Sequence, residues 1–285
     1  MHTTLIDPAT LATHLEDPAW VVLDARFDLT DPGKGETLHG DGHIPGARYA
    51  GLDTQFSGEK TGTNGRHPLP SPEVAAARFG ALGIGPDTQV VLYDADTGMF
   101  AARGWWMLRW LGHQAVAVLD GGLAAWQRAD LPVSTGVPVW TPATFTARLA
   151  DDARVPATDV EAHLGHAARI LVDARSNDRF RGENETLDPK AGHIPGAVNR
   201  FFQLNLTAEK TFKPAETLRA EWQDITGGPD ASRVVMYCGS GVTACHNLLA
   251  LEHAGLTGAR LFAGSWSEWC AMPERPRETG TGISG

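Results

Sequence analysis

The chain of 285 residues repeats itself once along its length. Four short motifs of the first half return in the same order in the second half. They are L-D-A-R at 23–26 and V-D-A-R at 172–175, G-H-I-P-G-A at 42–47 and 192–197, V-V-L-Y-D at 90–94 and V-V-M-Y-C at 234–238, and D-G-G-L-A-A-W at 120–126 and A-G-S-W-S-E-W at 263–269. The period is too long for a solenoid, whose units have about 20 to 50 residues. It suits a duplicated compact domain.

Each half alternates short apolar runs with helical patterns. Runs that predict buried strands occupy 20–24, 89–94, 116–120 and 233–237. Patterns that predict helices occupy 71–83, 99–112 and 245–255. The first of these helices has a serine N-cap followed by proline, and each of the three patterns ends at a glycine. Alternating strands and helices predict an α/β fold with two domains, each a parallel sheet flanked by helices.

The boundary between the two copies is marked by proline. The segment 131–142 carries several prolines and a glycine, which predicts an extended, irregular chain. We therefore expect a first domain at 1–137, a linker at 138–154 and a second domain at 155–272. The last residues, 273–285, are polar and glycine-rich, and this predicts a loose tail.

Charge and composition exclude several classes of protein. The net charge is −10, which argues against a general nucleic-acid binder because such proteins need a basic surface. No apolar stretch is long enough to span a membrane, and the N-terminus does not look like a secretory signal. Three cysteines are too few for a disulfide framework. These features predict a cytoplasmic protein whose thiols stay reduced.

The chemistry is expected at Cys238, where a strand gives way to a loop. The loop C-G-S-G-V-T joins that strand to a helix, and its glycines permit a tight turn. Successive amides in such a turn form an anion nest, and the following helix adds the positive end of its dipole. We expect this cradle to stabilise the thiolate of Cys238 and charge on any sulfur added to it. Such an activated nucleophile needs neither a metal nor a cofactor.

Two other roles for Cys238 are open at this stage. It could be a small buried hydrophobe, as many cysteines are. A metal site is disfavoured because Cys238, Cys245 and His246 lack the usual ligand spacings. Cys245 and Cys270 are interpreted as packing thiols. Asp94 takes the place of the cysteine in the first copy, so only the second copy is expected to be reactive.

With these motifs, the chain resembles the tandem-domain rhodanese family of sulfurtransferases over nearly its whole length. The loop C-G-S-G-V-T-A is similar to that of the 3-mercaptopyruvate members, whereas thiosulfate-type members usually carry basic or bulkier residues there. The resemblance implies two rhodanese-like domains, an inactive first copy and catalysis by Cys238. It implies that the cysteine takes sulfur from a small anionic donor, 3-mercaptopyruvate or thiosulfate, and becomes a persulfide. The sulfur then passes to cyanide or to a thiol, for example that of a thioredoxin-like protein.

The donor is an anion, while loop residues Gly239, Ser240, Gly241, Val242 and Thr243 are neutral. Positive charge must therefore come from elsewhere, and the segment 175–182 is rich in arginine.

Within that segment, Arg179 matches the family arginine that binds the donor carboxylate, and Arg181 is a second candidate. Arg175 belongs to the repeated D-A-R motif and is interpreted as structural. The family's second arginine is missing from the stretch 182–191 before the second G-H-I-P-G-A, where Lys190 is the only positively charged residue.

Proton handling is assigned by the resemblance to Ser240 and His43. Because His43 has a twin in His193, it could instead brace the repeated turn. His67, in G-R-H-P-L-P, is a further histidine that could face the pocket.

Two other functional classes are weighed against sulfur transfer. A cysteine phosphatase or arsenate reductase uses a similar loop, but a phosphatase needs arginine at the position of Ala244. A persulfide carrier without enzymatic activity is the remaining alternative.

Overall fold

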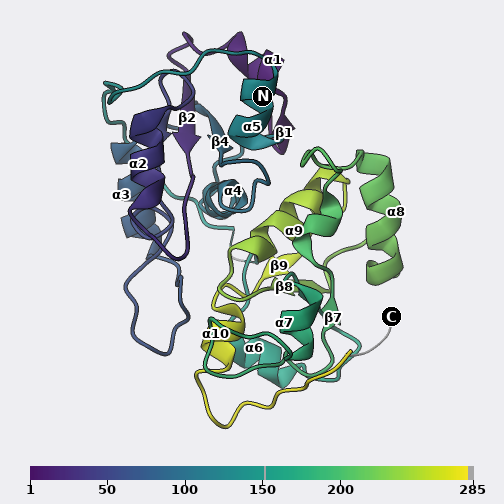
Figure 1. The fold of residues 1–285 in the computed structure, drawn as a ribbon. Coiled ribbons are helices and arrows are strands. Elements are labelled where there is room, and N and C mark those ends of the chain that lie inside the picture. Colours follow the sequence, from purple (N-terminus) through teal and green to yellow (C-terminus); the bar gives the residue numbers. More distant parts are fainter. Residues whose placement is uncertain (151, 282–285) are drawn as a thin grey trace. The chain divides into compact units, whose positions relative to one another are not determined.

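The computed structural model describes residues 1–150 and 152–281, which form two compact units (Figure 1). Unit 1 is built from 1–58 and 70–150 with the short segment 208–212. Unit 2 contains the rest of the described chain, including 59–69. A segment from the first half of the sequence is therefore part of the unit that holds Cys238. Residue 151 of the expected linker and 282–285 of the expected tail lie outside the described residues.

Unit 1 is a parallel five-stranded sheet with strand order β1-β5-β4-β2-β3. The strands are β1 (Leu5–Ile6), β2 (Trp20–Asp24), β3 (Arg48–Tyr49), β4 (Gln89–Tyr93) and β5 (Val116–Leu119). The helices are α1 (Pro8–Ala12), α2 (Lys34–Asp41), α3 (Pro72–Ala81), α4 (Ala101–Trp110) and α5 (Gly122–Arg128). Figure 1 shows α2 and α3 on one side of β2 and β4, and α1 and α5 on the other. Helices on both faces explain why β4 is buried throughout.

Unit 2 repeats this plan with a parallel four-stranded sheet of order β7-β6-β8-β9. The strands are β6 (Ile170–Asp173), β7 (Val198–Asn199), β8 (Val234–Tyr237) and β9 (Arg260–Leu261). The helices are α6 (Ala157–Ala162), α7 (Asn177–Arg181), the 3₁₀ helix η1 (Phe202–Asn205), α8 (Ala215–Thr226), α9 (Thr243–His253) and α10 (Ser265–Trp269). The predicted α/β class, with a parallel sheet flanked by helices in each half, is confirmed.

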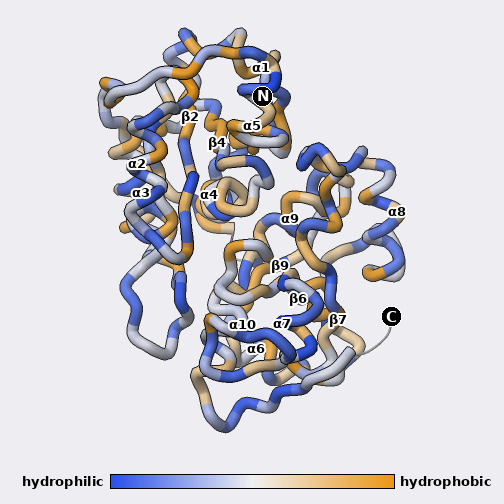
Figure 2. Tube along the Cα trace, in the orientation of Figure 1, coloured by the Kyte–Doolittle hydropathy of each residue, from blue (hydrophilic) through white to orange (hydrophobic). Residues whose placement is uncertain are grey.

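The sheet of unit 2 determines where Cys238 lies. Alternate residues of each strand face opposite sides of the sheet. Val235 and Tyr237 of β8 pack in a cluster that includes Trp266 and Trp269 of α10. The hydrophobic colouring in Figure 2 follows β4 and α4 in unit 1, and α9 in unit 2. Cys238 comes directly after β8, so it lies at the carboxyl end of a strand whose two neighbours are also parallel.

A buried aspartate–arginine pair joins the end of the second strand to the G-H-I-P-G-A turn in each unit. In unit 2, Arg175 donates to Asp173 Oδ2 (Nη2–Oδ2 2.7 Å) and to the carbonyl of Gly192 (2.7 Å). In unit 1, Arg26 makes the same two contacts with Asp24 and Gly42. The structural role predicted for the D-A-R arginine therefore agrees with its contacts in both copies.

The histidine of each G-H-I-P-G-A turn is held in the same way. The His43 backbone pairs with Ser134, and its Nδ1–H donates to His39 O (2.7 Å) while the two imidazole rings stack. The His193 backbone pairs with Glu278, and its Nδ1–H donates to Phe180 O (2.8 Å) while its ring stacks on that phenyl ring. Both histidines connect a turn to a distant segment of the same unit through an isolated antiparallel bridge.

The expectation of a loose tail is wrong for the residues around Glu278. Glu278 exchanges two backbone hydrogen bonds with His193, and Gly280 N donates to Arg181 O (3.0 Å). Trp269 Nε1 donates to Pro276 O (2.8 Å). These contacts could not be predicted from the polar composition of the segment, because the backbone makes most of them.

Among residues 1–150 and 152–281, no helix is long and apolar enough to cross a membrane.

Asp94 fills with its own carboxylate the loop that follows β4. Its oxygens accept hydrogen bonds from the amides of Gly98 (2.8 Å), Phe100 (2.8 Å) and Ala101 (3.3 Å). Burial raises the pKa of this carboxyl, and the three amides oppose that rise. The loop of the first copy is thus an anion nest whose anion is built in.

We predict that Asp94→Ala lowers the free energy of unfolding by about 2–4 kcal/mol, because it leaves buried amides without an acceptor. Denaturant titration would measure the loss, with Asp96→Ala as the matched control two residues away. An Asp94→Ala chain within about 0.5 kcal/mol of that control would contradict this role.

Candidate active site

Cys238 is nearly fully buried in a tight loop between β8 and α9. The amide of Gly241 donates to its sulfur (N–Sγ 3.2 Å), and Gly241 has a φ of +78°, which favours glycine. Cys245 Sγ–H donates to Gly241 O (3.2 Å) from the first turn of α9. The predicted loop therefore forms, with one of its two glycines in the left-handed region.

Ser265 secures the backbone of Cys238 and has an unusual conformation. Its hydroxyl accepts from Cys238 N (3.1 Å) and donates to Phe262 O (3.0 Å). Its φ is +56°, which is costly for a residue with a Cβ. In the repeat, the matching residue of unit 1 is Gly122, whose φ is +58° and where a Cβ would lie 2.6 Å from Asp94 O. Only the copy with the cysteine has a side chain here, and that side chain binds the cysteine amide.

The N-terminus of α9 offers further hydrogen-bond donors beside the sulfur. Helices leave their first amides without intrahelical partners, and α9 has no side-chain cap. The amides of Val242, Thr243 and Ala244 have no acceptor among the residues that the structure describes. In unit 1 the amides that correspond to those of Val242 and Ala244 belong to Gly98 and Phe100, and both donate to Asp94. The nest that is filled in unit 1 is thus available to a sulfur-bound anion in unit 2.

The segment 59–69 contributes a histidine to this loop. His67 is buried, and its Nδ1 lies 2.8 Å from Ser240 Oγ. Gly65 permits the close approach of the segment, because its φ is +90° and a Cβ there would lie 2.9 Å from Gly264 O. The histidine in hydrogen-bond contact with Ser240 is therefore His67, whereas His43 contacts His39.

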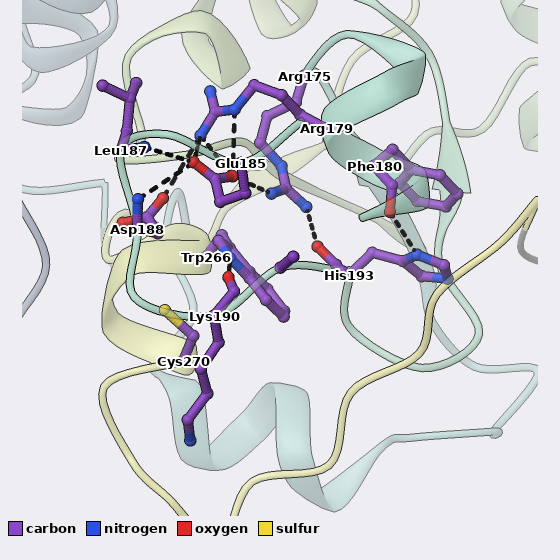
Figure 3. Close-up of polar contacts among 12 residues, drawn as sticks. Arg175, Arg179, Phe180, Glu185, Leu187, Asp188, Lys190, His193, Trp266 and Cys270 are labelled. Carbon is purple, nitrogen blue, oxygen red and sulfur yellow. Dashed lines mark hydrogen bonds and ion pairs between the residues drawn. The ribbon is translucent and has the colours of Figure 1, made fainter. Parts of the chain in front are cut away.

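Arg179 lies in a network of carboxylates and guanidinium groups, shown in Figure 3. Its Nη2 donates to both oxygens of Glu185 (2.9 Å each) and lies 3.4 Å from Asp188 Oδ2. Arg175 also contacts Glu185 (Nη1–Oε2 3.3 Å). Burial favours a raised pKa for Glu185, but the Leu187 amide and the Arg179 guanidinium outweigh it and lower the pKa.

Two guanidinium groups meet at Gly239, the residue after the nucleophile. A methyl group at Gly239 would lie 2.9 Å from Arg66 Nη2 and 3.4 Å from Arg179 Nη2. Arg66 is also ion-paired with Asp188, and its backbone amide donates to Ser267 Oγ (3.0 Å). Sequence reasoning missed Arg66, because nothing in the chain order shows that 59–69 packs in unit 2.

Other charged candidates take different places. Arg181 forms an ion pair with exposed Glu183 (2.7 Å), and no contact joins it to the Cys238 loop within the described chain. Figure 3 shows the side chain of Lys190 directed away from Arg179. Cys245 and Cys270 are buried free thiols, as the packing interpretation expects. In the part of the chain that the structure describes, no group of three or more His, Cys, Asp or Glu side chains could hold a metal ion.

The comparisons with known proteins agree with the repeated fold. A rhodanese-like domain model matches residues 7–129 and again 156–272. The chain belongs to the rhodanese family of sulfurtransferases. The doubled rhodanese match covers both copies of the repeat, including the one that carries Asp94.

Relatives and solved structures of this rhodanese chain carry two donor names. It is 46% identical to a probable 3-mercaptopyruvate sulfurtransferase of Pseudomonas aeruginosa, over 97% of this chain and 98% of the relative. It is 39% identical to a putative thiosulfate sulfurtransferase of Mycobacterium tuberculosis, over 97% of each. The solved 3-mercaptopyruvate sulfurtransferase from Leishmania major aligns with a TM-score of 0.84 and 30% identity, covering 96% of this chain and 75% of that one.

We predict that Glu185→Gln lowers the free energy of unfolding near pH 7 by about 1–3 kcal/mol, because it removes the carboxylate that Arg175 and Arg179 share and leaves each with one acidic partner. The folded pKa of Glu185 is lowered from 4.5, so its contribution is complete above that pH and is lost as the pH falls through the folded value. Denaturant titration from neutral to acidic pH would show the two chains converging in acid.

The matched control is Glu183→Gln, which removes an exposed acid from an ion pair with Arg181. It should leave the free energy of unfolding nearly unchanged, because an exposed ion pair contributes little. A constant difference between Glu185→Gln and the unsubstituted chain at every pH would contradict the assignment.

Proposed function

We propose that the chain transfers a sulfane sulfur from 3-mercaptopyruvate to an acceptor through a persulfide on Cys238. The observation that carries this proposal is the Cys238 sulfur in a neutral amide nest, beside the paired His67 and Ser240 and the guanidinium groups at Gly239. The names of relatives at 46% and 39% identity support sulfur transfer. They name two donors, 3-mercaptopyruvate and thiosulfate.

The first half-reaction is an attack by the Cys238 thiolate on the donor sulfur. An Sγ–S bond forms, the C–S bond of the donor breaks, and its electron pair stays on carbon as an enolate. A proton on that carbon then gives pyruvate, and Cys238 holds a persulfide anion. The thiol proton that the donor brings in is the proton that its carbon needs. The amides of Val242 and Thr243 can donate hydrogen bonds to the new negative sulfur.

This reaction needs a proton relay, and His67 with Ser240 supplies one. The 2.8 Å contact between His67 Nδ1 and Ser240 Oγ couples a titratable ring to a hydroxyl two residues from the nucleophile. Transfer from thiosulfate needs no such relay, because sulfite leaves without a proton. A built histidine–serine pair therefore favours the 3-mercaptopyruvate donor over thiosulfate.

Charge balance favours the same donor. Three arginines and three acids form one ion-paired cluster at the site: Arg66, Arg175, Arg179, Asp173, Glu185 and Asp188. Their formal charges cancel, so each negative charge on a donor is added to a neutral cluster. Mercaptopyruvate with a protonated thiol brings one charge, whereas thiosulfate brings two, and the desolvation cost rises with charge. Arg179 is assigned to the donor carboxylate.

The second half-reaction returns Cys238 to its thiolate. A nucleophile such as cyanide or a small thiol attacks the outer sulfur, and the Sγ–S bond breaks with its electron pair on Sγ. A protein thiol of the thioredoxin type is the expected biological acceptor.

Incubation with 3-mercaptopyruvate alone should add about 32 Da, one sulfur atom, to the intact chain. Cys238→Ser should gain nothing, while Cys245→Ser, which removes the neighbouring buried thiol, should still gain the sulfur. The absence of an adduct on the unsubstituted chain would refute the mechanism. A kcat/KM for thiosulfate above that for 3-mercaptopyruvate would reverse the choice of donor alone.

We predict that His67→Asn lowers kcat with 3-mercaptopyruvate by about 100-fold or more, because asparagine keeps a hydrogen bond to Ser240 but does not carry a proton. The rate with thiosulfate in the same variant is the internal control and should change by less than about fivefold. Equal losses with both donors would show that His67 only holds the loop in place.

A further inference from the structure

Arg66 occupies a position that a donor-binding residue would need. Its guanidinium lies against Gly239, directly after the nucleophile, where a methyl group would be 2.9 Å from Nη2. The side chain is 28% exposed, so it remains open to a small molecule. Arg179 lies at the same glycine, with a side chain that is 20% exposed. Two partly open guanidinium groups therefore border the Cys238 loop.

Three contacts hold Arg66 in place before any donor arrives. Its amide donates to Ser267 Oγ, its Nη1 pairs with nearly fully buried Asp188, and Gly65 lets its backbone approach Gly264 closely. Asp188 also contacts Arg179 (3.4 Å), so one carboxylate orients both guanidinium groups. A side chain fixed in this way loses little further entropy on binding, which is the advantage of a preorganised site.

We propose that Arg66 is a donor-binding residue, and that it and Arg179 together hold the carboxylate of the sulfur donor from two sides. The assignment rests on the proposed function, since it concerns the donor of that reaction. The stretch between Arg181 and the G-H-I-P-G-A turn contains no arginine, Arg181 itself pairs with exposed Glu183, and Lys190 is directed away. Arg66, from a distant part of the chain, supplies a second guanidinium group in place of the arginine missing from that stretch. Its planar donors suit a carboxylate in a way that an ammonium group does not.

The absence of a side chain at residue 239 fits this arrangement. Gly239 is not in the left-handed region, so its backbone does not require glycine. A Cβ at this position would lie 2.9 Å from Arg66 Nη2 and 3.4 Å from Arg179 Nη2. Both guanidinium groups therefore reach the residue that follows Cys238.

The test compares two donors in Arg66→Ala, Arg66→Lys and the unsubstituted chain. Mercaptoacetone keeps the thiol and the ketone of 3-mercaptopyruvate but lacks the carboxylate. With 3-mercaptopyruvate, we expect Arg66→Ala to lower kcat/KM by at least about tenfold, mainly through KM, and Arg66→Lys to recover part of that loss. With mercaptoacetone, kcat/KM should change by less than about threefold in either variant.

Arg128→Ala is the matched control, because it also removes one arginine charge but from an exposed position in unit 1. It should leave both donors unaffected. Equal losses with the two donors in Arg66→Ala would mean that Arg66 only supports the loop, and an unchanged kcat/KM for 3-mercaptopyruvate would remove it from the donor site. Either result overturns the assignment.

Failure of the proposed function is seen separately, when the unsubstituted chain gains no sulfur from 3-mercaptopyruvate. Calorimetric binding of 3-mercaptopyruvate to Cys238→Ser, with and without Arg66→Ala, needs no turnover and still decides the role of Arg66. A dissociation constant at least about tenfold weaker supports it, and an unchanged one overturns it.

Discussion

The site depends on the buried ion pair between Asp173 and Arg175. It fixes the end of β6 to the turn at Gly192, and through Glu185 it reaches Arg179. The pair Asp24 and Arg26 makes the same connection to the turn in unit 1. Because the pair occurs in both units, its primary role is structural. In the second copy, one further carboxylate, Glu185, connects this pair to Arg179 beside the Cys238 loop.

The two copies differ where the chemistry differs. Asp94 stands in the place of Cys238, and Gly122 in the place of Ser265. The first exchange supplies a permanent anion to the nest, and the second removes the hydroxyl that holds the cysteine amide. Each change alone would impair sulfur chemistry in unit 1. Together they are consistent with a first domain that keeps the fold but lacks the nucleophile.

The sequence was sufficient to predict the features that repeat or that lie within one continuous stretch of the chain. The strands, the parallel sheets and the Cys238 loop follow from local patterns, because burial and tight turns limit the residues that fit. Arg66 and His67 could not be placed, since they lie in the first half of the chain but in unit 2. For the same reason, the sequence analysis named His43 together with Ser240 for proton handling. A motif does not show that the His43 backbone pairs with Ser134. Backbone pairing likewise anchors Glu278 despite its polar neighbours.

The filled nest of unit 1 indicates what the open nest of unit 2 lacks. An aspartate carries its charged oxygens two bonds beyond Cβ, and a cysteine persulfide carries its outer sulfur at the same remove. Asp94 is in this sense a resident mimic of the loaded cysteine, and it caps α4 as a persulfide would cap α9. Under the proposed chemistry, the sulfur-loaded enzyme is therefore the better-capped protein. Without the added sulfur, the amides of Val242 and Ala244 have no acceptor among the described residues, so sulfur storage and conformational stability rise together.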